Sequence, residues 1–264
     1  MTSISAYVLT NNSEKYLAQI LVQLARIAED IVVLDSGSQD ATEAICADFS
    51  TVRFLHRPLD DFKSQRNYAA AQCRYDWILF VASDEIPDAD FVQSVRQLKT
   101  AGFDCDTYTV SRHWYVLGQP IVNMYPIVSP DRPIRLFDRR VASFTQDSNR
   151  VHESLRGGQR EGKIGGKLFH HTMETKAEIQ RKLEHYTDIA ALDLLDQDKP
   201  LARWRMYLSP IGAFCKWYGI RRGYRDGRLG LYLGKYAFDY TYKKYQKARA
   251  LNRRRKKMPD ENSE

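Results

Sequence analysis

The sequence predicts an α/β protein built on a mostly parallel, doubly wound sheet, and three observations lead to this fold class. Short apolar runs alternate with helix-length segments through the amino-terminal part of the chain. Two of these runs, at 31–34 and 78–81, are apolar without alternation, as expected for strands covered on both faces. Polar residues follow each run directly, and the carboxyl edge of such a sheet is where ligands bind.

The amino-terminal part is expected to consist of strands and helices in alternation. The polar turn 10–13 can cap the first helix, and Asp-Ser-Gly-Ser at 35–38 forms a tight turn after the second strand. A later helix opens at Asp61, and Asp88 is expected to cap another. The expected strands are 4–9, 30–35, 52–55 and 78–81, and the expected helices are about 14–25, 40–49 and 61–72.

The chain changes character at Cys105, where short β-branched and aromatic segments replace the alternating pattern. Three prolines then mark a loop long enough to act as a lid over an acceptor. Pro200 and Pro210 are expected to begin and to break a helix. The remaining expected elements are strands at 107–111, 114–117, 134–137, 151–155 and 165–170, helices at 176–195 and about 231–251, a segment at 211–218, and a disordered tail at 252–264.

Composition excludes several classes of protein. A chain of 264 residues with 43% hydrophobic and 28% charged residues is long enough and apolar enough for a sizeable core. No apolar run approaches the roughly 20 residues that span a bilayer, and the start of the chain lacks a signal-peptide pattern, so we expect a cytoplasmic protein. The four cysteines form no CxxC pair, which argues against a zinc site and a disulfide framework and predicts buried thiols.

Positive charge is concentrated at the end of the chain. Residues 1–200 carry a net charge of −5, whereas 201–264 carry +12. The aromatic residues interleaved with these cations suit an anionic membrane surface, so we expect the C-terminus to contact one. No stacking platform or groove-reading motif accompanies them, so we expect no nucleic acid as partner. A solvated helix face is the alternative interpretation.

Polar residues at three strand ends are expected to meet in one crevice. Thr10, Asp35 and Asp84 each lie just beyond the carboxyl end of a different predicted strand. Asp84 is a candidate ligand for a divalent metal that carries phosphates, although a solvated turn carboxylate would give the same pattern. Neither GxGxxG nor GxxxxGK[ST] occurs, so a nucleotide would have to be held by carboxylates, a metal and Arg66.

The second half contains candidates for acid-base chemistry. Glu153 stands next to His152 and near Arg150, a combination that general-base catalysis can use. An exposed strand position is the alternative for Glu153. His171 is a candidate metal ligand, although lone histidines more often pack or lie on the surface.

Short motifs along residues 3–250 together resemble glycosyltransferase family 2, with the GT-A fold. The closer resemblance is to bacterial lipopolysaccharide inner-core β-glucosyltransferases that act on heptose. Each motif is weak alone, but their order and spacing are specific. They are Val-Leu-Asp35-Ser-Gly-Ser-Gln-Asp40, His56-Arg57-Pro58, Gln65-Arg66-Asn67, Asp76-Trp77-Ile-Leu-Phe, Asp84-Glu85, Arg135-Leu136-Phe137, Val151-His152-Glu153, His170-His171 and Arg225-Asp226-Gly227.

The resemblance implies roles for individual residues. Asp35 would contact the uracil or ribose of a UDP-sugar, and Asp84 would hold Mg²⁺ or Mn²⁺ on the diphosphate, with His171 as a further ligand. Glu153 would be the catalytic base. The expected donor-binding set is Thr10, Asn12, Asp35, Ser36, Gln65, Arg66, Asn67 and Asp84.

It also implies a reaction and a domain organisation. An inverting transferase would move a sugar, expected to be glucose, from UDP to a lipid-linked core saccharide at the inner face of the inner membrane. Alternatives are an enzyme for capsule or O-antigen, or an inactive nucleotide-binding scaffold. The expected domains are 1–172 for the transferase (1–104 for the nucleotide-sugar half and 105–172 for the acceptor half), 173–251 for a helical basic and aromatic extension, and 252–264 for the tail.

The sequence departs from the family pattern at two positions. Ser13 stands where relatives usually carry an acid after the first strand, and Ala82-Ser83-Asp84 replaces Asp-x-Asp. Loss of the first acid removes a ribose or metal contact, which would alter donor affinity, metal dependence or activity itself. The retention of Asp84 and Glu153 favours an active enzyme.

Overall fold

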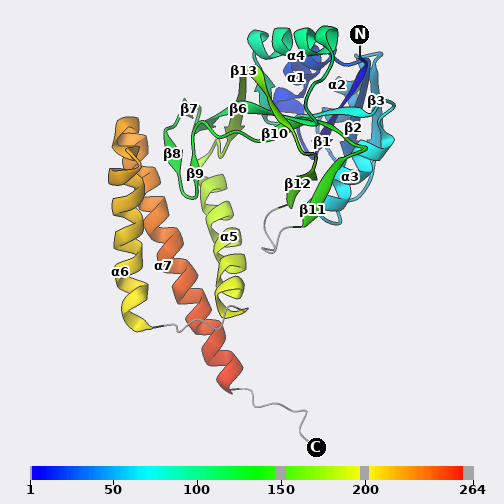
Figure 1. Ribbon diagram of the computed structural model, residues 1–264. Helices are drawn as coiled ribbons and strands as arrows, with labels where there is room; N and C mark the ends of the chain where they lie inside the picture. The colour runs from blue at the N-terminus through cyan, green and yellow to red at the C-terminus, as the bar shows by residue number, and fades with distance from the viewer. Residues whose placement is uncertain (1, 147–152, 197–201, 258–264) are drawn as a thin grey trace, which may run out of the picture. The chain divides into compact units, whose positions relative to one another are not determined.

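The computed structural model describes residues 2–146, 153–196 and 202–257 (Figure 1). It divides into two compact units. The first unit comprises Met1–His113 and Pro130–His171, and the second comprises Trp114–Ser129 and Thr172–Glu264. Each unit is considered by itself below.

Four parallel strands form the amino-terminal part of the sheet in the first unit, in the order β3-β2-β1-β4. Every residue of β2 is buried, which confirms the prediction made from its continuous apolar run. The predicted α/β fold with a parallel sheet is therefore correct. The strands are β1 (Ile4–Thr10), β2 (Asp30–Asp35), β3 (Val52–His56) and β4 (Trp77–Phe80).

Helices cover both faces of these strands because successive strand side chains point to opposite faces. Ile4, Ala6 and Val8 pack in one core with α1, α2 and α4. Tyr7 packs in the other core with α3 and with a separate β-hairpin. The helices are α1 (Glu14–Leu24), α2 (Thr42–Ala47), α3 (Phe62–Gln72) and α4 (Ala89–Ala101).

The remaining strands add antiparallel pairs, and we call them the mixed part of the sheet. β10 runs antiparallel to both β4 and β6, and β13 runs antiparallel to β5. The two strands expected at 107–111 and 114–117 are a single strand, β6, and the short strand β5 was not predicted. The elements are β5 (Glu85–Pro87), β6 (Thr107–Val116), β7 (Gln119–Pro120), β10 (Ile134–Asp138), β13 (Glu161–Thr172), and the hairpin β11 (Ala142–Gln146) with β12 (Glu153–Gly157).

The second unit is mainly helical, with residues 114–129 packed onto it. These residues were expected in the acceptor half, but their polar contacts lie with the helical part: Val122 N donates to Asp226, and Asn123 Nδ2 donates to the Arg221 carbonyl. The elements are β8 (Asn123–Met124), β9 (Ile127–Val128), α5 (Lys176–Asp196), α6 (Arg203–Phe214), a π-helical segment Cys215–Ile220, a 3-10 turn Gly223–Asp226, and α7 (Gly227–Lys257).

Two predictions about these helices were wrong. Pro210 does not break the helix but lies inside α6, where it is buried. Packing of α6 along α7 offsets the cost of the missing N–H (Figure 1). The expected tail is also shorter, because α7 continues to Lys257, while 258–264 and Pro200 lie outside the described residues.

The expectation of four buried cysteines holds only for Cys46 and Cys73, whose thiol pKa values are raised by burial to about 11 and about 12. Cys105 is partly exposed, and Cys215 is exposed. The apolar surroundings of a cysteine therefore could not be judged from its spacing alone.

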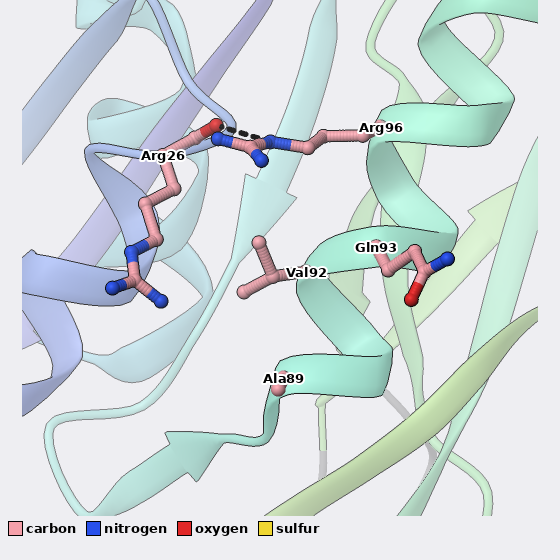
Figure 2. A pocket seen from close by; sticks show the side chains of 5 residues that line it. All are labelled: Arg26, Ala89, Val92, Gln93 and Arg96. Atoms are coloured by element: carbon pink, nitrogen blue, oxygen red, sulfur yellow. Dashed lines mark hydrogen bonds between the residues drawn. The ribbon is translucent and has the colours of Figure 1, made fainter.

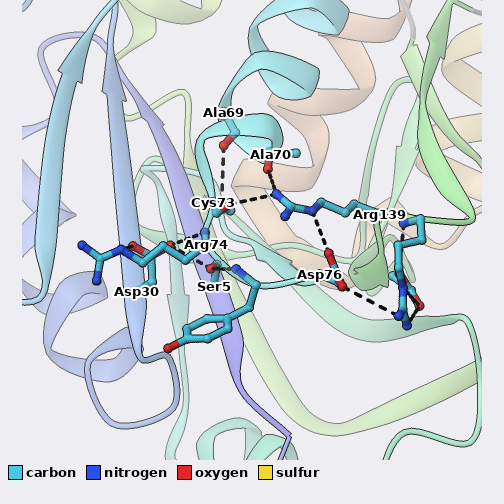
Figure 3. Close-up of polar contacts among 11 residues, drawn as sticks. Ser5, Asp30, Ala69, Ala70, Cys73, Arg74, Asp76 and Arg139 are labelled. Atoms are coloured by element: carbon cyan, nitrogen blue, oxygen red, sulfur yellow. Dashed lines mark hydrogen bonds and ion pairs between the residues drawn. The ribbon is translucent and has the colours of Figure 1, made fainter.

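A polar network closes the amino ends of the parallel strands (Figure 3). The buried carboxylate of Asp30 accepts hydrogen bonds from Ser5 Oγ at 2.8 Å and from the Arg74 backbone N–H at 2.8 Å. Arg139 donates to the carbonyls of Ala70 and Cys73 at the end of α3. These contacts satisfy buried polar groups at this edge of the sheet.

Glu85, the residue after Asp84, is fully buried at the start of β5. Arg135 of β10 donates to both carboxylate oxygens, at 2.6 and 2.9 Å, and Arg112 of β6 donates at 2.8 Å. Burial raises the pKa of Glu85, but the Arg135 and Arg112 guanidiniums outweigh it and hold that pKa far below its usual range. One carboxylate thus joins three strands of the mixed part of the sheet.

Replacing this carboxylate should destabilise the first unit. Glu85→Gln leaves the buried Arg135 without the acid it pairs with and leaves Arg112 with Asp131 alone of its two acids, so we expect the free energy of unfolding at pH 7 to fall by about 3–5 kcal/mol. Because the folded pKa of Glu85 is depressed, its contribution is present above about pH 4.3 and lost as the pH falls further. The difference between the two proteins should therefore shrink in acid.

Urea denaturation followed by circular dichroism at several pH values measures this. Glu161→Gln is the control, since Glu161 is exposed and makes no ion pair within the described residues, so a change of less than about 0.5 kcal/mol is expected. Equal stability of Glu85→Gln and wild type at pH 7 would contradict the role given to Glu85.

Candidate active site

The carboxylate of Asp35, at the end of β2, organises the loop that follows it. It is 3% exposed and accepts hydrogen bonds from Thr10 Oγ1, Gly37 N, Ser38 N and Ser38 Oγ at 2.5–2.8 Å. Burial raises its pKa, but the hydrogen bonds from Ser38 and Gly37 outweigh this and hold the pKa below its ordinary value. Thr10 and Asp35, both expected in the site, are therefore brought together.

The turns after β1 and β2 are fastened to each other. Asn12, in the left-handed region with φ of 51°, donates its backbone N–H to Ser38 Oγ at 2.7 Å. Its side-chain oxygen accepts from Gln39 N at 2.9 Å. Ser13, at the position where an acid was expected, donates its N–H to Thr42 Oγ1 at 2.9 Å. The two turns form one continuous polar edge.

Gln65 joins α3 to this edge. Its Nε2 donates to Ser36 Oγ at 3.2 Å and to the Arg57 carbonyl at 3.0 Å. A carbonyl can only accept, so the amide orientation is fixed by this contact. Gln65 Oε1 is buried and has no hydrogen-bond partner in the described part of the chain. A buried oxygen left without a hydrogen bond costs about 1–3 kcal/mol, so a ligand N–H or O–H group that reached Gln65 Oε1 would be bound favourably.

Arg66 is held by aromatic rings on the same side of the sheet. Its guanidinium carbon lies 4.3 Å from the Phe80 ring centroid and 5.1 Å from that of Phe144. Cation–π contacts of this kind hold a guanidinium in place. Arg66 also lines a cavity.

The strand ends also place Asp84 near a histidine, and that residue is His170. Asp84 is 39% exposed, and its Oδ2 lies 3.2 Å from His170 Nε2. His171, the expected ligand, donates its backbone N–H to the Asp84 carbonyl at 2.8 Å, and its ring stacks on Tyr16 at 4.9 Å. Neighbouring residues of β13 point to opposite faces, so only one of the pair can approach the carboxylate.

A cavity of about 560 Å³ in the first unit is lined by cations and apolar side chains, with Ser154 and Leu155 of β12 in its wall. Glu153, the candidate base, is the first residue of β12 and pairs in register with Gln146. Asp147, Arg150 and His152 lie outside the described residues. The residues lining the cavity are Arg66, Thr109, Arg112, Arg132, Pro133, Ile134, Arg135, Phe144, Ser154, Leu155, Glu161 and Lys163.

Another cavity, of about 620 Å³, lies between α4 and the turn after α1 (Figure 2). Arg96 Nε donates there to the Arg26 carbonyl at 3.0 Å. None of the candidate site residues lines it.

Comparison with known proteins bears on this arrangement. Residues 5–144, more than half of the chain, match the family described as Glycosyl transferase family 2. The chain belongs to this family. The lipopolysaccharide core biosynthesis glycosyltransferase LpsC of Rhizobium meliloti (strain 1021) is 27% identical to it over 256 residues, which cover 92% of each chain.

Further relatives are more distant. An uncharacterized glycosyltransferase of Rickettsia felis is 24% identical over 230 residues, covering 84% of this chain and 81% of that one. The solved structure of S. aureus TarS 1–349 covers 95% of this chain and 92% of its own, with a TM-score of 0.46 and 14% identity. The predicted family is confirmed.

The residues at the strand ends fit a divalent cation only in part. In the described ranges no group of three or more His, Cys, Asp or Glu is placed to hold a metal ion. Asp84 and His170 supply two donors, while Glu85 is committed to its arginines. Mg²⁺ in such enzymes is held by one or two carboxylates together with phosphate oxygens and water. This donor set fits a cation that arrives with a diphosphate.

Asn67 has a structural contact that was not expected. Its Nδ2 donates to the Phe144 carbonyl at 2.9 Å, and its Oδ1 accepts from Phe144 N at 3.0 Å. The side-chain amide thus pairs with the backbone of β11 as a neighbouring strand would. Asn67, expected to line the donor site, fastens α3 to the hairpin that carries Glu153. We call this pair of hydrogen bonds the Asn67 clamp.

Removal of the Asn67 clamp should loosen the hairpin selectively. In Asn67→Ala the Phe144 N–H and carbonyl lose both partners, so we expect a loss of about 1–3 kcal/mol in unfolding free energy. Amide hydrogen exchange should accelerate in β11 and β12 and stay unchanged in β1 and β2. Lys63→Ala, in the first turn of the same helix, is the control. Unaltered exchange at Phe144 in Asn67→Ala would show that the clamp does not hold the hairpin.

Proposed function

We propose that the protein is an inverting glycosyltransferase that moves a sugar, with glucose as the expected one, from UDP to a lipid-linked core saccharide. The observation that carries the proposal is the carboxyl edge of the parallel strands, where Thr10 and Asp35 are hydrogen-bonded to each other and Asp84 follows β4 in the chain. The similarity to LpsC, a lipopolysaccharide core biosynthesis glycosyltransferase that aligns over most of both chains, supports the choice of acceptor.

The donor would lie along the edge formed by the two fastened turns. Asp35 shapes this edge through its own loop, and Ser36 and Gln65 complete it. Thr10 and Asn12 contribute by holding the turns together. In this proposal Asp35 acts on the nucleoside chiefly by fixing backbone N–H groups, because its oxygens already accept four hydrogen bonds.

Asp84 would hold Mg²⁺ or Mn²⁺ at the diphosphate, with His170 beside it and in place of the expected His171. When bound, such a cation neutralises the charge that grows on the leaving UDP. Asp84 suits this role because its carboxylate is 39% exposed, whereas Glu85 next to it is fully buried. Arg66 adds a fixed positive charge on the same side of the sheet.

Glu153 would act as general base on the acceptor. It removes the proton from an acceptor hydroxyl while the hydroxyl oxygen attacks the anomeric carbon, and the bond from that carbon to the diphosphate breaks. One displacement inverts the anomeric centre, so no second carboxylate nucleophile is needed. The cavity beside β12 supports this placement, since Ser154 and Leu155 line it together with Arg66. Its cations, Arg132 and Lys163 among them, suit an acceptor that carries anionic groups.

We further propose that the enzyme works at the inner face of the inner membrane, with its C-terminal part on an anionic surface. No helix in the described ranges has an apolar stretch long enough to cross a bilayer. Residues 201–264 supply the cations for surface contact, with a net charge of +12.

An inactive nucleotide-binding scaffold is the second candidate, and Ala82 and Ser13 favour it. Isothermal titration with UDP and Mn²⁺, followed by an assay for release of sugar from UDP-glucose, separates the two. The enzyme binds UDP and releases sugar, whereas the scaffold binds without release. UDP-galactose and other UDP-sugars in the same assay identify the donor. A preference for a sugar other than glucose would favour an enzyme that builds another surface polysaccharide.

Asp84→Asn should abolish metal-dependent binding of UDP and leave the fold intact, because the exposed carboxylate is the acid at the strand end that is not engaged by arginine. Titration of UDP with and without Mn²⁺ measures this. Asp90→Asn, an exposed acid in the first turn of α4, is the control and should bind like wild type. Wild-type binding by Asp84→Asn would rule out the metal role of Asp84.

Glu153→Gln should lower turnover by roughly 10² to 10⁴, the usual contribution of acid-base catalysis, with UDP affinity nearly unchanged. A base acts on the acceptor and not on the nucleotide, so only the chemical step suffers. Glu161→Gln changes the acid that lines the cavity and should retain most of the activity. Full turnover in Glu153→Gln would refute the assignment of the base.

A further inference from the structure

Exposed apolar side chains gather on one stretch of the second unit. Half of the large apolar side chains that are exposed in the described part of the chain lie between residues 204 and 231. Single exposed apolar residues are normal, but a contiguous group marks an interaction surface. The group begins on α6.

One face of α6 carries the core of this group. Trp204, Tyr207, Leu208 and Ile211 are 59, 58, 58 and 52% exposed. Their spacing of three, four and seven residues places them on one side of a helix. Cys215, also exposed, follows at the next turn. We call these four large side chains the α6 stripe.

The α6 stripe points away from the interior of the second unit. Pro210, between stripe positions, is buried, and α6 lies along α7 (Figure 1). Ile220, at the end of the π-helical segment, is 78% exposed as well. An amphipathic helix in a globular protein normally buries its apolar face, so this one has the opposite arrangement.

Cations precede and follow the α6 stripe along the chain. Between residues 203 and 228 the chain has seven Lys or Arg and one acid, Asp226, which accepts from Val122 N. Arg205 lies with its guanidinium carbon 5.5 Å from the Trp204 ring centroid. Trp and Tyr beside Arg and Lys are typical of helices that lie in a membrane interface.

We infer that α6 is the element that enters an anionic lipid bilayer, with the α6 stripe among the upper acyl chains and the flanking cations at the lipid phosphates. The inference rests on the proposed function, since it explains how the enzyme reaches a lipid-linked acceptor. In this inference the main contact with the membrane is made by α6 and not by the end of the chain. A second copy of the chain fits less well, because a two-fold interface would bring the same cations together.

Vesicle binding tests this directly. Wild type should bind vesicles of phosphatidylcholine with phosphatidylglycerol, and bind phosphatidylcholine alone more weakly. A double variant with Trp204→Ser and Leu208→Ser, the α6 pair, should have a vesicle partition coefficient lower by about tenfold or more. Withdrawing even one large apolar side chain from an apolar environment usually has this effect. The matched control is the pair Leu59→Ser and Phe62→Ser, which are 50 and 55% exposed in the first unit and should bind normally.

A second measurement does not depend on how the variants fold. An environment-sensitive dye on Cys215 should shift to the blue when anionic vesicles are added. Cys105→Ser removes the competing thiol, and Cys46 and Cys73 are buried. If the protein binds vesicles but the emission of the dye does not shift, the inference is wrong.

Other outcomes are also decisive. Equal binding by the α6 pair and wild type, or loss of binding only when Arg253, Arg254 and Arg255 are changed to Ser, would refute α6 as the contact. If the α6 pair bound vesicles like wild type but had a smaller particle size by light scattering, the α6 stripe would be an interface with a second copy of the chain. Transfer to a short soluble acceptor, measured without vesicles, tests the proposed function separately and should be unchanged in the α6 pair.

Discussion

The buried carboxylate of Glu85 is the constraint on which the mixed part of the sheet depends. It receives three hydrogen bonds from two arginines on β6 and β10, and it sits on the strand that pairs with β13. Because the loss of Glu85 would leave Arg135 buried without the acid it pairs with, the strands are held in one arrangement. The residue just before it, Asp84, is thereby presented at the surface beside His170.

The parallel half of the fold could be predicted from sequence because its signals are local. Continuous apolar runs such as Ile31–Leu34 report burial on both faces, and polar turns report strand ends. Asp35 and Thr10 were brought to one place by topology alone. The same reasoning gave the caps Asp61 and Asp88, which accept from Ser64 N and Phe91 N.

The remaining features depend on pairings between distant residues. Nothing local distinguishes Glu85, which is buried, from Asp84, which is partly exposed. The difference arises because Arg112 and Arg135, on other strands, pair with Glu85. Likewise, the register of β13 decides which of two adjacent histidines meets Asp84, and the sequence does not contain that register. Pro210 stays helical for a tertiary reason too, the packing of α6.

The Asn67 clamp has a thermodynamic consequence. It ties the helix that carries Gln65 and Arg66 to the hairpin that carries Glu153 through two short contacts to one backbone unit. A displacement of α3 by a donor would therefore move the hairpin as well. If donor binding changes acceptor affinity in this way, acceptor binding must change donor affinity by the same factor. Under the proposed function, the clamp would couple the binding of the two substrates, whichever of them binds first.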